Sequence, residues 1–135
     1  MNLKKALLIL MIVFYIFAGY YHFANPALYY PIIPPYLSEW SKSLNILSGI
    51  IEIALALMLI PSGTRKAAAW GIFIMLIAFI PSHIYFIQKG HFQLGSLEIT
   101  PFIAWFRLLV VHPVLLLWAW YISKTEDVKL VPVEE

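Results

Sequence analysis

Four long apolar stretches decide what this chain can fold into. A helix that crosses a hydrocarbon layer of ~30 Å needs about 20 apolar residues, and each stretch comes close to that length. Helices suit such a layer because all backbone hydrogen bonds stay within the segment. The sequence therefore predicts an all-α polytopic membrane protein, a four-transmembrane-helix bundle in a single membrane domain over 1–135, with spans at about 6–23, 44–60, 67–87 and 101–122.

Composition agrees with a lipid environment and excludes several functional classes. Hydrophobic residues make up 62% of the chain and charged residues only 12%, and the mean hydropathy is +0.84. The net charge of +2 is spread over the connections without a basic cluster, so no nucleic-acid partner is expected. The chain has no cysteine, which excludes disulfides, thiol catalysis and thiolate metal ligands.

The distribution of basic residues predicts the orientation of the bundle. Cytoplasmic connections of membrane proteins carry an excess of lysine and arginine. With four spans, Lys42 and Lys89 fall on one side, and the other side holds Lys4, Lys5, Arg65, Lys66, Lys124 and Lys129. Both termini are therefore expected in the cytoplasm.

The outer connection at 24–43 is too apolar to be an ordinary solvated linker. Its four prolines, Pro26, Pro31, Pro34 and Pro35, disfavour a regular helix. A compact cap in the headgroup region is expected, either roofing the bundle or lying beside it. Inside the spans, Pro81 is expected to kink the third helix, and Pro113 frees a carbonyl in the fourth.

A few polar side chains lie inside the apolar stretches. Helical rise puts His22 and His83 within roughly 6 Å of the outer ends of their spans, Arg107 at about 9 Å and Glu52 at about 12 Å. An unpaired charge at such depth is costly, so Glu52 and Arg107 are predicted to share a polar centre. The expected binding residues are Glu52, Arg107, His83, His22, Asn45 and Ser48.

Two interpretations of this cluster stay open. A buried ion pair can serve only to specify helix packing, or the cluster can form an outward-facing pocket that binds a ligand or relays a proton. His112 lies five residues beyond Arg107, about 140° around an ideal helix, and is assigned to a different contact. Haem ligation by His22 and His83 is chemically sound but less favoured. No ligand spacing predicts a metal site.

Several motifs give the chain a resemblance to a known family. The most specific are HFANP at 22–26, SGIIE at 48–52 and the single arginine of the last span, Arg107. With IIPPYL, TRKAAAWG, FIPSHIYF and WFRLLVVHPVLLLWAW, they resemble the DoxX-like family of small bacterial and archaeal membrane proteins. The resemblance extends from about Gly19 to Tyr121. The motif positions that it carries over are His22, Pro26, Ser48, Gly49, Glu52, His83 and Arg107.

The resemblance implies a four-helix bundle in the plasma membrane of a prokaryote and a link to quinone-dependent oxidation. The chain is accordingly expected to be an accessory subunit of a membrane redox system that binds a quinone or another small hydrophobic ligand. Its partners would be the lipid bilayer, redox subunits or further copies of itself. It carries no self-contained catalytic motif, so enzymatic activity is left open. The alternative is an assembly factor or chaperone, in which the Glu/Arg/His cluster is purely structural.

Overall fold

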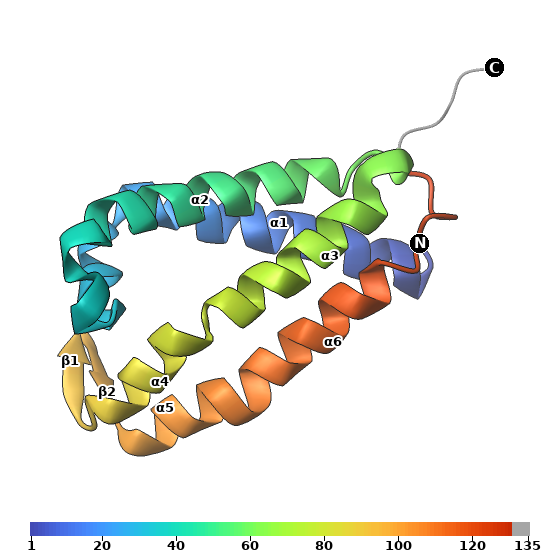
Figure 1. Ribbon diagram of the computed structural model, residues 1–135. Helices are drawn as coiled ribbons and strands as arrows, with labels where there is room; N and C mark the ends of the chain where they lie inside the picture. The colour runs from blue at the N-terminus through green and yellow to red at the C-terminus, as the bar shows by residue number, and fades with distance from the viewer. Residues whose placement is uncertain (131–135) are drawn as a thin grey trace.

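A computed structural model describes residues 1–130 and contains four helical segments long and apolar enough to cross a membrane, as expected. They cover Leu3–Ala24, Pro35–Met58, Ser62–Gln88 and Pro101–Ile122. The long helices run alongside one another in a bundle (Figure 1). In chain order the elements are α1 (Leu3–Ala24), η1 (Pro26–Leu28), η2 (Tyr30–Ile32), η3 (Pro35–Trp40), α2 (Ser41–Met58), α3 (Ser62–Ala78), α4 (Ile80–Gln88), β1 (Phe92–Leu94), β2 (Leu97–Ile99), α5 (Pro101–Phe106), the π-helical η4 (Arg107–Val111) and α6 (His112–Ile122).

The bundle has an apolar core near the end that holds the two termini. Small residues such as Ala56, Ala68 and Ala119 let the four helices approach closely there, and larger side chains fill the space between them. We call this set the terminal core: Leu8, Met11, Ile12, Tyr15, Ala56, Leu59, Ala68, Ala69, Ile72, Met75, Leu76, Ala119, Ile122 and Val128. Many other large apolar side chains point outward, including Phe17, Ile77 and Leu117. Outward-facing apolar side chains are what a helix surface in contact with lipid requires.

One buried arginine organises the end of the bundle near the termini. Arg65 has no exposed surface. It donates hydrogen bonds to the carbonyls of Leu59 and Ile60 at the end of α2, and to those of Thr125 and Val128 after α6. The carbonyls at a helix C-terminus lack partners within the helix, so a cation is favoured there.

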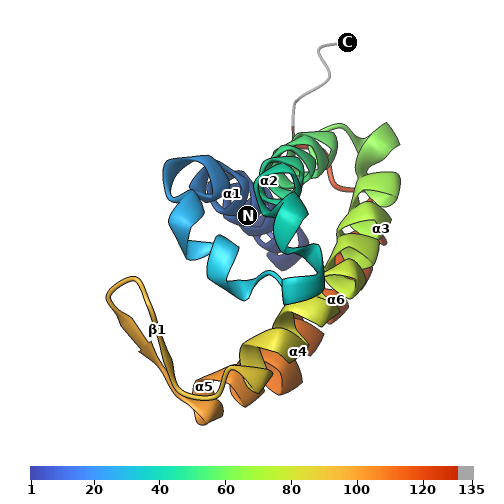
Figure 2. The ribbon, with the colours of Figure 1, turned by 60° about the vertical axis from the view of Figure 1, so that its left-hand side comes forward.

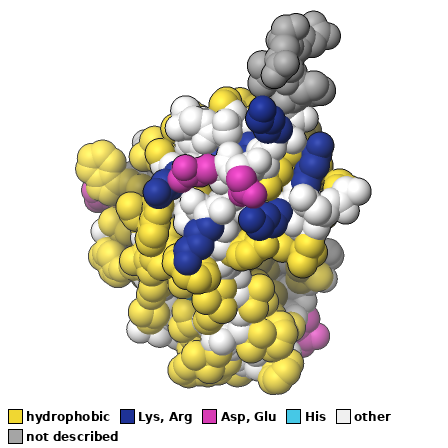
Figure 3. Space-filling model, turned by 90° about the vertical axis from the view of Figure 1, so that its right-hand side faces the viewer, with side chains coloured by type: hydrophobic (Ala, Val, Ile, Leu, Met, Phe, Trp, Pro, Cys, Tyr) yellow, Lys and Arg dark blue, Asp and Glu magenta, His cyan; other side chains and the backbone are white. Residues whose placement is uncertain are grey.

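The start of α1 and the segment that follows α6 lie at this end of the bundle. Lys4 pairs with Asp127 at 3.2 Å, which places the start of α1 beside the segment that follows α6. Lysine, arginine and acidic side chains gather on this end, above a largely apolar surface (Figure 3). Residues near the start of α1 and residues just after α6 therefore lie side by side.

The opposite end is covered by the connection between α1 and α2. Residues 26–40 form the three short 3-10 helices η1, η2 and η3, which we call the lid, over the ends of α1 and α2 (Figure 2). Ile32 of the lid packs against a small apolar cluster formed by Phe86, Ile99 and Ala104. The connection is thus compact, as predicted from its prolines, and it contacts the second half of the chain.

The connection between α4 and α5 contains a short β-hairpin, which the sequence did not predict, in a chain that is otherwise helical as expected. Phe92 pairs with Ile99 and Leu94 with Leu97 in an antiparallel register. Gly95 has a φ of +60°, as expected at the first central position of a two-residue type II′ hairpin turn. With three residues each, the strands are too short to produce a clear alternating pattern in the sequence.

Prolines interrupt both helices of the second half. α3 ends at Ala78 and α4 begins at Ile80, with Pro81 in the first turn of α4. This break is the kink that the sequence predicted. In the last span, a π-helical turn at 107–111 precedes Pro113. Such turns inside α-helices commonly occur at functional sites.

Candidate functional site

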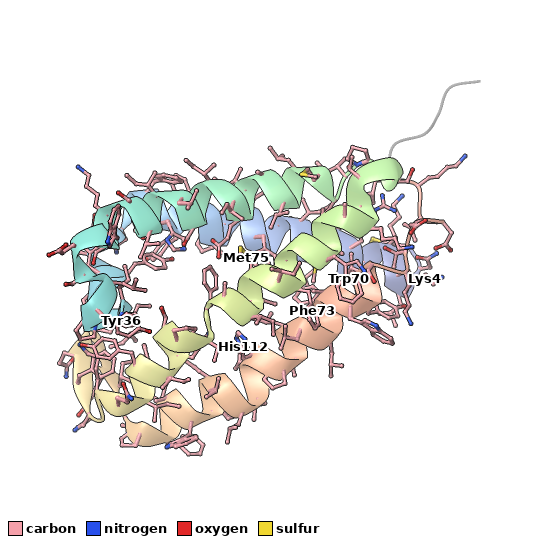
Figure 4. All side chains as sticks on the ribbon, viewed as in Figure 1. Lys4, Tyr36, Trp70, Phe73, Met75 and His112 are labelled. Atoms are coloured by element: carbon pink, nitrogen blue, oxygen red, sulfur yellow. The ribbon has the colours of Figure 1, made fainter. Side chains whose placement is uncertain are left out.

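A cavity of about 610 Å³ lies between the lid and the terminal core. Most of its wall is apolar and comes from the lid, α2 and α3, and Met75 belongs both to this wall and to the terminal core (Figure 4). A small number of polar side chains interrupt the apolar wall. They include all six residues expected from the sequence: His22, Asn45, Ser48, Glu52, His83 and Arg107.

The first polar group joins α1 to α2. The side-chain amide of Asn45 donates to the backbone carbonyl of His22 at 2.9 Å, and its oxygen lies 2.7 Å from His22 Nδ1. Only this amide orientation donates to the carbonyl, so the Asn45 oxygen must accept from a protonated Nδ1. The tautomer of His22 is fixed in this way, and Nε2 points toward Glu52.

Glu52 completes this group. Its Oε2 lies 3.4 Å from His22 Nε2, and both side chains are buried. Among the described residues Glu52 Oε2 has no hydrogen-bond partner, so Nε2 and the carboxylate are close but not bonded. Because Nδ1 keeps its proton for Asn45, one further proton can be accommodated at this contact. That proton resides either on Glu52, with a neutral imidazole, or on His22, as an ion pair. Asn45, His22 and Glu52 therefore form a chain that can take up or release a proton at the cavity wall.

Helix packing holds this proton-exchanging chain in place. Gly19 and Gly49 let α1 and α2 approach so closely that a Cβ on Gly19 would lie 2.7 Å from the Gly49 carbonyl oxygen. Tyr29 of the lid stacks on the His22 ring with 3.7 Å between centroids. Burial, with the nearby Glu52, raises the pKa of the Tyr29 phenol to about 12, so Tyr29 stays neutral. The lid thus covers the imidazole from above.

The second polar group belongs to the other half of the chain. The Arg107 guanidinium lies over the Phe86 ring, with 4.1 Å between Cζ and the ring centroid. Within residues 1–130, Arg107 forms no ion pair with a carboxylate. Stacking on an aromatic ring stabilises a cation but leaves the N–H donors at the guanidinium edge free for other partners. Arg107 is therefore an available donor on the cavity wall.

The predicted pairing of Glu52 with Arg107 is wrong in its detail. Both residues line one cavity, but the partner of Glu52 is His22. Membrane depth indicated that the two charges lie at similar levels, whereas the close packing of α1 on α2 decides which side chain reaches the carboxylate. Depth alone carries no information on that packing.

His112 lies next to this second group but does not line the cavity. Its ring meets that of His83 edge to face at 4.6 Å. The backbone N–H of His112 donates to the Arg107 carbonyl, five residues earlier, so one π-helical turn separates them instead of the larger rotation of an ideal α-helix. A π-helical turn has no sequence signature beyond the nearby Pro113.

The geometry also bears on the haem alternative. Axial ligation needs a free ring nitrogen on each histidine. His22 has one nitrogen bonded to Asn45 and the other directed at Glu52. Haem ligation by His22 would therefore break its contacts with Asn45 and Glu52.

Sequence reasoning missed two aromatic residues of the site. Tyr29 covers His22, and Phe86 supports Arg107. The YY pair at 29–30 within the proline-rich connection was the available signal for Tyr29. Phe86 lies one turn after His83 on α4, and that spacing could have indicated a shared face.

Comparison with known proteins places the chain in a family. A family model described as "Domain of unknown function (DUF8561)" matches residues 11–123, which include α2 to α6 and all residues of the cavity wall. Comparisons with curated proteins and with solved structures give no match. The resemblance to DoxX-like proteins stays a prediction from the motifs.

Proposed function

The chain belongs to the DUF8561 family, and we propose that it binds a quinone or a similar small hydrophobic ligand as an accessory subunit of a membrane redox system. One observation carries the proposal. An apolar cavity of about 610 Å³ presents a proton-exchanging chain from the first half of the protein and, from the second, an arginine that forms no ion pair within residues 1–130.

The cavity suits such a ligand in size and lining. Pockets for small ligands typically measure about 300–1,000 Å³ and combine apolar walls with a few converging polar groups. A quinone is an apolar ring with two carbonyl oxygens, which accept hydrogen bonds. Arg107 can donate to one carbonyl, and a proton on Glu52 or on His22 can serve the other.

Quinone chemistry suggests which steps this protein would perform and which a partner subunit would perform. Reduction of a quinone to a quinol takes up two electrons and two protons. The chain would bind and orient the ring, stabilise negative charge on an oxygen through Arg107, and exchange protons through Glu52 and His22. The electrons would come from a partner redox subunit. The resemblance to DoxX-like proteins supports this redox role.

Native mass spectrometry of the gently solubilised protein, taken from its own membrane, tests the proposal. We expect a quinone to accompany the 15.5 kDa chain. Arg107→Gln should lower its occupancy about tenfold, the effect of losing ~1.4 kcal/mol of binding free energy. Lys89→Gln is the matched control, because Lys89 is also a cation over aromatic rings, those of Tyr85 and Phe92, but lies outside the cavity wall.

The stability of Glu52 and Arg107 variants distinguishes a ligand site from a cluster with a purely structural role. Because Glu52 and Arg107 form no ion pair, Glu52→Gln and Arg107→Leu should change stability additively. If each variant failed to fold and the double variant folded, the charges would form a structural pair and the ligand site would lose its basis. A chain that carries only ordinary phospholipid would favour the assembly-factor alternative.

A further inference from the structure

The residues around the cavity differ sharply in exposure, and the exposed ones lie on one side. Leu47 and Ile51 on α2 are 53% and 36% exposed, and Ile74 on α3 is 65% exposed. Ala78 on α3 and Pro81 on α4 are exposed as well. Leu47 with Ile51, and Ile74 with Ala78, are pairs four residues apart, so each helix presents one row of side chains to the opening. We call this set the rim.

The lining residues on the other sides of the cavity are less exposed. The lining residues of α1 and the lid, among them Ala18, Tyr29 and Leu37, are half-buried or buried. At the outer end, Ile32 packs onto the cluster around Phe86. Toward the termini, α2 and α3 meet where Leu55 lies against Gly71, with so little space that a Cβ on Gly71 would be 2.6 Å from Leu55 Cδ2. The opening is thus bounded by the lid at one end and by Leu55 at the other.

The position of the opening along the helices indicates that it faces lipid. The rim belongs to the two segments Pro35–Met58 and Ser62–Gln88, which are apolar enough to cross a membrane. From the Leu55–Gly71 contact, α2 and α3 diverge toward the lid (Figure 1). All five rim residues have apolar side chains, so the opening suits a hydrocarbon chain better than water.

We propose that the ligand is a membrane-dissolved amphiphile with a single apolar chain, which enters between α2 and α3 and leaves its chain across the rim while its polar head contacts Arg107. This inference rests on the proposed function, because it requires the cavity to bind a ligand. It adds the class of ligand and the route. The lid residues Tyr29, Ile32 and Leu37 line the cavity and would separate the head group from water.

Photo-crosslinking in lipid nanodiscs tests the route. The probe is decylubiquinone with a photoreactive diazirine at the end of its chain, and the competitor is the same quinone ring without a chain. We expect the label on peptides that contain the rim residues of α2 and α3. Ala78→Trp should lower labelling and binding of the chain-bearing probe about tenfold, a clearly larger loss than for the ring alone.

Neighbouring positions provide matched controls. Ile77 is exposed on α3 next to Ala78 but does not line the cavity, so Ile77→Trp should leave both ligands unaffected. Label confined to the lid, or an equal effect of Ala78→Trp on both ligands, would overturn the lateral route while the cavity still bound the ring. If neither ligand bound the unmodified protein, the proposed function itself would fail, and the inference with it.

Discussion

At the scale of single residues, the strongest constraint is the burial of Arg65. Its guanidinium makes four hydrogen bonds of 2.6 to 2.9 Å to backbone carbonyls from two parts of the chain. In Arg65→Met these carbonyls would lose their donors inside a closed core. We expect the free energy of unfolding to fall by about 3 kcal/mol, as measured by SDS titration in mixed micelles.

The adjacent lysine is the control for this variant. Lys66 is exposed and pairs with Glu126 at 3.4 Å on the surface. Lys66→Met should change the free energy of unfolding by less than about 1 kcal/mol, because surface ion pairs contribute little. Equal losses in the two variants would show that loss of charge matters at this end of the bundle, and that the buried hydrogen bonds do not.

Single residues also show how far the sequence can predict the site. Glu52, Arg107, His22 and His83 were found because charge and imidazole are costly within an apolar span, and all four line the cavity. Their contacts were not predicted. The partner of Glu52 depends on the 3.4 Å approach of His22, which two glycines on separate helices permit. A linear sequence does not record which helices touch.

At the scale of elements, the approach of α1 to α2 supports the proton-exchanging chain. In Gly19→Ala the new Cβ would lie 2.7 Å from the Gly49 carbonyl oxygen and 2.7 Å from Ile53 Cγ1. The helices must separate, so we expect a loss of about 1–3 kcal/mol in the free energy of unfolding. A thermal unfolding scan in detergent would detect this change as a lower midpoint.

Gly63, in the first turn of α3, provides the control for Gly19. Gly63 is helical too, but a Cβ there would meet no atom within 4 Å. Gly63→Ala should leave the midpoint unchanged or raise it slightly, since alanine is the better helix former. A similar loss in both variants would contradict the close-packing explanation of Gly19.

The elements themselves were predictable where their length is set by the membrane. The four apolar stretches correspond to four helical segments, and Pro81 marks the break between α3 and α4. The hairpin at 92–99 and the π-helical turn at 107–111 were not foreseen. Both features are defined by backbone hydrogen bonds over only a few residues. Such short features leave no periodic hydrophobic pattern in the sequence.

At the scale of the whole molecule, the two ends of the bundle differ in charge and in packing. The end with the termini combines the terminal core, the buried Arg65 and most of the basic residues. The lid end contains the cavity and only two lysines, Lys42 and Lys89. The rigid packing of one end leaves the diverging helices of the other free to form a binding site.

The same asymmetry predicts how the molecule sits in a membrane. Since basic residues favour the cytoplasmic side, the lid and the cavity should face away from the cytoplasm. The chain has no cysteine, so single cysteines can report the topology without background. With an impermeant maleimide on intact cells, we expect Glu39→Cys in η3 and Ser96→Cys in the hairpin turn to react. Glu126→Cys, after α6, should react only once the membrane is permeabilised. The opposite pattern would place the lid in the cytoplasm, and protons exchanged through Glu52 would then come from the cytoplasmic side.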